Sequence, residues 1–135
     1  MAIWGIGANY NDPDGKKRDV LRAFLSSDRA YIGYSSAQAP SLHCMLGAIK
    51  TGDIIYVKSF WAKRLNIKAL GIVTDPTAVK TDDMGTGISV KWKKDFKAIS
   101  FDIDAPGGKN NVYSNTLYEE FNPEIANLLI DELIR

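Results

Sequence analysis

The sequence predicts one α+β domain in which helices flank a small, mostly antiparallel β-barrel. Five or six short runs of β-branched and aromatic residues alternate with turn-rich segments. Helical patterns fall between these runs and after the last of them. The chain has 135 residues, 45% of them hydrophobic, which is enough for one packed core and too few for two. We therefore expect a single domain over residues 1–135.

The first third of the chain contains two expected strands and one expected helix. Residues 3–8 form the first strand, and residues 9–15 have the composition of a loop. Residues 16–27 are predicted to be helical because their apolar residues recur at helical spacing. Those apolar residues are Val20, Leu21, Phe24 and Leu25. A strand at residues 30–34 and a loop at residues 35–40 follow.

The middle of the chain contains the clearest strand pair. Ser41 is expected to cap a helix over residues 42–50. Residues 53–60 and 67–74 are both rich in β-branched residues, and the six-residue connector between them suits adjacent antiparallel strands. Asp75 and Pro76 are expected to end the second strand.

The last third contains one regular strand, one less regular strand and a helix. Residues 80–87 are expected to form a loop, after which Ile88, Val90 and Trp92 alternate with polar residues. A weaker strand pattern consists of Phe96, Ile99 and Phe101, and residues 105–111 have loop composition. Asn122 then caps a C-terminal helix. Its docking face consists of Ile125, Leu128, Leu129, Ile130 and Leu133.

Charge and targeting patterns limit the location and the partners. The formal net charge is +1, with a surplus of positive charge in residues 1–68 and of negative charge in residues 69–135. This balance disfavours a binder that relies mainly on electrostatics. The start has no signal-peptide pattern, and no apolar run is long enough to span a membrane. We therefore expect a cytoplasmic protein that does not bind membranes.

The residues that catalysis or metal binding would need are sparse. His43 and Cys44 are the only histidine and the only cysteine, and helical neighbours point about 100° apart. A Cys–His nucleophilic pair and a zinc site are therefore not expected, and Cys44 is interpreted as a small buried hydrophobe. The acidic pairs Asp82–Asp83 and Asp102–Asp104 are interpreted as surface loop residues. No catalytic residue, metal or cofactor is predicted.

One segment carries a resemblance to a known superfamily. Residues 49–59 read IKTGDIIYVKS, and residues 67–73 read IKALGIV. Together they resemble the central hairpin of the PUA-like superfamily, which includes EVE, YTH and ASCH domains. The segments WGIGAN at residues 4–9 and YIGY at residues 31–34 fall at compatible positions. The resemblance implies an EVE-like barrel whose mouth receives a single or flipped nucleobase of DNA or RNA, often a modified one.

Polar and aromatic side chains follow three expected strands, where such a pocket would form. The expected base-binding residues are Asn9, Tyr10, Tyr34, Ser35, Phe60 and Trp61. Aromatic stacking contributes about 1–3 kcal/mol per base, and amides and hydroxyls bond to base edges. Lys58 and Arg64 are expected to contact the backbone. Each residue also has a structural interpretation, in which the rings fill the core and Ser35 forms a turn.

Two other functional classes remain open at the level of sequence. The chain could be an ASCH-like enzyme acting on nucleotides or RNA, with Lys58 and Asp53 as acid or base. It could instead be an adaptor for a small ligand or a protein, since its net charge is nearly neutral. A homo-oligomer or a separately encoded effector is compatible with each of these functions.

Overall fold

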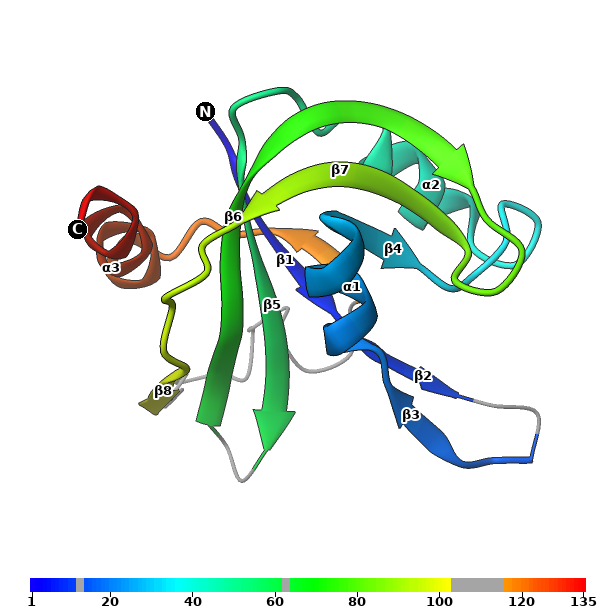
Figure 1. Ribbon diagram of the computed structural model, residues 1–135, viewed down its shortest axis with the longest axis horizontal. Helices are drawn as coiled ribbons and strands as arrows, with labels where there is room; N and C mark the ends of the chain where they lie inside the picture. Colours follow the sequence, from blue (N-terminus) through cyan, green and yellow to red (C-terminus); the bar gives the residue numbers. More distant parts are fainter. Residues whose placement is uncertain (12–13, 62–63, 103–115) are drawn as a thin grey trace.

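The computed structural model describes residues 1–11, 14–61, 64–102 and 116–135. Nine strands and three helices lie in these ranges (Figure 1). The strands are β1 (Ile3–Gly7), β2 (Asn9–Asn11), β3 (Lys17–Asp19), β4 (Arg29–Ile32), β5 (Ile54–Trp61), β6 (Arg64–Lys80), β7 (Thr86–Trp92), β8 (Ile99–Asp102) and β9 (Leu117–Glu119). The helices are α1 (Leu21–Ser27), α2 (Pro40–Leu46) and α3 (Pro123–Ile134).

Seven strands form one curled sheet, and this confirms the predicted fold class. Their order is β4-β7-β6-β5-β1-β9, with β8 pairing to β6, and among the pairings only β1–β5 is parallel in the described residues. The long strands β6 and β7 arch over α1 and α2, so that the sheet makes a half-barrel (Figure 1). Within the described residues it ends at β4 and at β9. The fold is therefore α+β with a mostly antiparallel sheet and a C-terminal helix.

The two faces of the sheet pack into two separate cores. In β5, Ile55 and Val57 belong to the first core, which α1 and α2 cover through Phe24 and Leu46. Ile54 and Tyr56 belong to the second core, which α3 covers. This alternation follows from the two-residue period of a strand. The first core also contains Trp4 and Trp92.

The region before α1 differs from the sequence prediction. The composition of residues 9–15 predicts a loop, but β2 pairs with β3 in an antiparallel hairpin. The helix expected from residue 16 begins only at Leu21, where the Asp19 carboxylate accepts a hydrogen bond from the backbone N–H of Leu21. Asn-Tyr-Asn has turn propensity, but pairing with Lys17–Asp19 overrides it. This correction matters because β2 carries much of the candidate site.

The hairpins in the middle of the chain are longer than expected. β5 and β6 are adjacent and antiparallel, as predicted, but their connector is shorter because both strands extend toward it. β6 also continues past Asp75 and Pro76 to Lys80. The register to β7 shifts on both sides of Asp75, and a bulge of this kind is where a strand tolerates proline. The β6–β7 loop is thereby reduced to residues 81–85.

The helix ends show where capping signals hold. At α3 the Asn122 side chain accepts a hydrogen bond from the backbone N–H of Glu124, which confirms the predicted N-cap. At α2 the prediction that Ser41 is the N-cap is wrong. The helix begins at Pro40, and Ala39 is the N-cap residue. No helix within the described ranges is long and apolar enough to cross a membrane.

Candidate functional site

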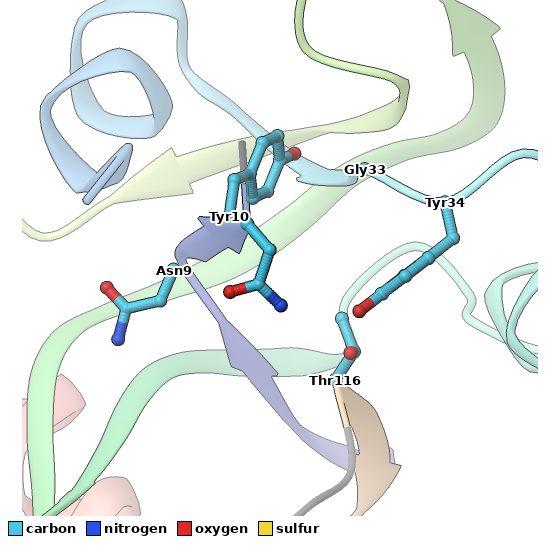
Figure 2. A pocket seen from close by; sticks show the side chains of 6 residues that line it. Asn9, Tyr10, Gly33, Tyr34 and Thr116 are labelled. Carbon is cyan, nitrogen blue, oxygen red and sulfur yellow. The ribbon is translucent and has the colours of Figure 1, made fainter. Parts of the chain in front are cut away.

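Two adjoining pockets lie where β2, the end of β4 and the β6–β7 loop meet. The small pocket has a volume of about 80 Å³ and is lined by Asn9, Tyr10, Asn11, Gly33, Tyr34 and Thr116 (Figure 2). The large pocket has a volume of about 360 Å³ and extends to residues 80–86. The two share Tyr10, Asn11, Gly33 and Tyr34. A ligand that fills both would contact this shared wall.

Tyr10 is the fixed part of the shared wall. Its hydroxyl donates a 2.6 Å hydrogen bond to the backbone oxygen of Met84 in the β6–β7 loop. Its ring lies against Gly33, where an added Cβ atom would come within 3.0 Å of the ring. Burial raises the pKa of Tyr10 above its ordinary value of 10.0, and the charge of Arg18 only partly offsets this. The neutral Tyr10 side chain therefore joins β2, β4 and the β6–β7 loop.

Tyr34 is the accessible ring of the site. The residue is 44% exposed, and its side chain extends from the end of β4 toward Thr116 (Figure 2). Its backbone oxygen accepts a 2.8 Å hydrogen bond from His43 Nε2 in α2, which requires the proton on that nitrogen. Because its backbone is held and its ring is not enclosed, Tyr34 can offer a stacking surface without a large change of structure.

The residues that line the small pocket are uncharged. Asn9 and Asn11 alternate with Tyr10 along β2, and their amides supply both donors and acceptors. Thr116 is positioned by a 2.8 Å hydrogen bond from the backbone N–H of Gly7 to its carbonyl oxygen. Amides, a hydroxyl and a tyrosine ring together suit a neutral planar ligand with hydrogen-bonding edges.

The large pocket has charges of both signs, in equal number. Arg18 and Lys80 line it together with Asp82 and Asp83. The Thr81 hydroxyl donates to the carbonyl oxygen of Gly85 at 2.8 Å and so closes the loop that carries the two aspartates. This pocket has no excess charge and gives no general attraction for an anion.

Ser35 lines the large pocket but is already bonded within its own turn. Its Oγ accepts a hydrogen bond from the backbone N–H of Gln38 at 3.2 Å. The Gln38 side-chain oxygen in turn accepts one from the backbone N–H of Ser35 at 3.0 Å. This reciprocal pair has the geometry of a capping box, and it fixes the chain just after Tyr34.

The structure brings four of the eight predicted site residues to these pockets: Asn9, Tyr10, Tyr34 and Ser35. Phe60 packs against the second core, whereas Tyr10 packs against the first, so the two rings do not face a common cavity. Phe60 is an even number of residues from Ile54 and Tyr56 along β5, so its side chain points to the same face of the sheet. This alternation is visible in the sequence and could have predicted the position of the Phe60 ring. The side chain of Trp61 lies outside the described residues.

The two predicted backbone-contacting residues lie in different places: Lys58 pairs with Gly7 at the end of β1, near Thr116 of the small pocket, whereas Arg64 lies at the start of β6. Lys58 Nζ lies 5.7 Å from the ring centroid of Tyr118, and burial lowers the pKa of Lys58. Arg64 is exposed at the start of β6, opposite Trp61 in the register. Their contact with nucleic acid stays a prediction.

A buried hydrogen-bond network lies beside Lys58. Tyr56 Oη donates to Glu120 Oε1 at 2.6 Å and, with its proton so used, accepts from Tyr118 Oη at 2.7 Å. Burial is the main cause that raises the pKa of both tyrosines, and the Glu120 charge adds to it. The network holds β5 to β9 and to the segment between β9 and α3.

Asp53, considered above as an acid or base, has a structural environment. Its carboxylate accepts hydrogen bonds from the backbone N–H of Ala2 at 3.0 Å, from Trp4 Nε1 at 3.0 Å and from the backbone N–H of Lys50 at 2.9 Å. Burial by itself would raise the pKa of Asp53, but these hydrogen bonds lower it below its ordinary value. Asp53 therefore joins β1 to the turn before β5.

Other residues of the site are missed or assigned differently by sequence patterns. Gly33, Thr116 and residues 81–85 have no local signal, because only the pairing of distant strands brings them to Tyr10. The prediction that Cys44 is buried is wrong: it is exposed because it lies on the solvent side of α2. His43 acts as a donor to the backbone of Tyr34. Residues 105–111 and Asp104 lie outside the described residues, as does the Asp102 side chain.

Comparison of the chain with protein-family models and with curated proteins finds no match to either. The candidate site therefore stands on its own geometry.

Proposed function

We propose that this chain is a PUA-like, EVE-type domain that binds a single nucleobase of DNA or RNA, modified or unmodified. The base enters at the wall shared by the two pockets and stacks on Tyr34. The observation that carries the proposal is the convergence of Asn9, Tyr10 and Tyr34 from two separate strand ends on one uncharged pocket.

The dimensions and chemistry of the pockets agree with this ligand. The small pocket alone is below the roughly 300–1,000 Å³ of typical ligand sites, and the large pocket, at about 360 Å³, is within that range. A base that stacks on Tyr34 in the large pocket can direct one edge toward Asn11, which lines both pockets. The absence of charge among the small pocket's lining residues favours the neutral heterocycle over its phosphate.

The first experiment measures binding and the contribution of the Tyr34 ring. Fluorescence anisotropy is recorded with modified and unmodified oligonucleotides, single-stranded and duplex, at two salt concentrations. Tyr34→Ala is expected to weaken binding by roughly 5- to 150-fold, because it removes stacking of about 1–3 kcal/mol. Tyr34→Phe keeps the ring and is the matched control, expected to bind nearly as the unchanged protein does.

Two results would overturn the proposed function. One is that no oligonucleotide binds even at low salt. The other is that Tyr34→Ala binds every oligonucleotide as tightly as Tyr34→Phe. Circular dichroism of both variants checks the fold, which should be unaffected because Tyr34 is exposed.

A further inference from the structure

A third cavity, here called the lysine cleft, lies between the end of α1, the middle of β6 and the segment after β7. Its volume is about 240 Å³, and three lysines line it: Lys68, Lys93 and Lys94. Asp28 is its one acidic lining residue, so lysines outnumber acidic residues by two in the lining. The large pocket beside Tyr34 carries no excess. The cleft is thus the better place for an anion.

One of the paired lysines of the cleft can exchange its present partner for a ligand. Lys68 Nζ lies 3.4 Å from Asp19, and Lys93 Nζ lies 3.4 Å from Asp95. The side chain of Asp19 is 54% exposed and that of Asp95 is 84% exposed. The Lys68 side chain is 30% exposed, whereas that of Lys93 is 16% exposed and its Nζ also donates to the backbone oxygen of Arg135 at 3.0 Å. The more exposed pair, Lys68 with Asp19, is therefore the one in which a phosphate can replace the carboxylate at little cost.

The rest of the lining is apolar and gives the cleft a floor. Trp92 is buried there, and its indole N–H is shared between the carbonyl oxygens of Phe24 and Arg29. Phe96 is half-buried and Leu25 is 41% exposed at the cleft. Aromatic residues interleaved with lysines are typical of proteins that bind single-stranded nucleic acid.

The strand β3 links the lysine cleft to the candidate base pocket. Arg18 in β3 lines the large pocket and lies 5.9 Å from the ring centroid of Tyr10. The next residue, Asp19, contacts Lys68 of the cleft. The two sites therefore adjoin neighbouring residues of one short strand.

We propose that the lysine cleft binds the phosphodiester backbone of a single-stranded nucleic acid whose base occupies the pocket at Tyr34. This inference rests on the proposed function and assigns the backbone contacts to Lys68 and Lys94. The strand leaves the base pocket beside Arg18, passes along β3 and places a phosphate in the cleft.

The salt dependence of affinity tests this assignment. For a single strand, the slope of log affinity against log salt becomes shallower by about 0.7 for each phosphate that the protein no longer neutralises. Lys68→Gln and Lys94→Gln are each expected to make the slope shallower by about that amount. Each is also expected to weaken oligonucleotide binding at low salt several-fold. Lys50→Gln, an exposed lysine after α2, makes the same charge change elsewhere and should leave the slope unchanged.

The two proposals fail in different ways. A nucleoside, which has no phosphate, should bind Lys94→Gln as it binds the unchanged protein. If both cleft variants keep the original slope while Tyr34→Ala still weakens binding, the lysine cleft assignment is wrong and the base pocket stands. If the cleft variants weaken binding but Tyr34→Ala does not, the base pocket fails, and the proposed path from it fails too. Binding of an acidic polypeptide in preference to the oligonucleotide would also overturn the assignment.

Discussion

Replacing Asp53 by alanine is expected to lower the free energy of unfolding by about 3–5 kcal/mol. The substitution leaves three donors without their acceptor, and one of them, Trp4 Nε1, is fully buried. An unsatisfied buried donor costs about 1–3 kcal/mol, and bonds to a charged acceptor are the stronger kind. A decrease of this size is a large part of the roughly 5–15 kcal/mol that typically stabilises a domain. Urea denaturation followed by tryptophan fluorescence measures it.

Asp131→Asn on the exposed side of α3 is the control, and its effect should stay within about 0.5 kcal/mol. Asp53→Asn keeps one acceptor oxygen, so its loss of unfolding free energy should lie between those of Asp53→Ala and Asp131→Asn. The contribution of Asp53 is expected to depend on pH. Its folded pKa lies below the ordinary 3.8, so the stabilisation is present above that pH and is lost as the pH falls through the folded pKa. Equal urea midpoints for Asp53→Ala and Asp131→Asn would show that the Asp53 carboxylate does not hold β1 in place.

The second large effect is expected in alkali, where the protein should lose stability steeply above about pH 10. Tyr10, Tyr56 and Tyr118 have pKa values raised above the ordinary 10.0, chiefly by burial. The folded chain therefore keeps three protons that the unfolded chain releases. Each retained proton costs about 1.4 kcal/mol of stability per pH unit, so three cost about 4 kcal/mol per unit. Urea denaturation at a series of pH values measures the slope.

Tyr10→Phe is the informative variant, because it removes one of the three groups and only one hydrogen bond, that to Met84. The alkaline slope should fall by about a third. Lys58 acts in the opposite direction, since burial lowers its pKa below the ordinary 10.5, and its effect ends at that pH. A free energy of unfolding that stays constant between about pH 10 and about pH 11.5 would contradict the burial of these hydroxyls.

Local sequence patterns were sufficient to predict a strand with regular alternation and a helix with a standard N-cap. The alternation in β7 and the Asn122 cap of α3 are both found in the structure. Patterns failed where a distant partner decides the conformation. β2 is a strand because β3 pairs with it, and β6 continues through Pro76 because a bulge accommodates the proline. Such long-range pairing leaves no signal within a short window of sequence.

Four of the eight predicted site residues line the candidate site, and the rest of its lining depends on long-range strand pairing. Tyr10 is an aromatic residue in a segment of polar composition, where burial in a core did not explain it well. Phe60 lies within β5, and its position in the alternation of that strand packs it against the second core. Thr116 and the loop of Met84 reach the site only through the order of the strands.

Mapping the binding site by amide chemical shifts in nuclear magnetic resonance spectra tests the central claim most directly. A single-stranded oligonucleotide is titrated into the labelled protein, and every assigned backbone amide is followed. We expect the largest shifts at residues 9–11, 33–35 and 81–85, with smaller shifts at Lys68 and Lys94. Shifts confined to Phe60 and Arg64, at the far end of β5 and β6, or no shifts at all, would contradict it.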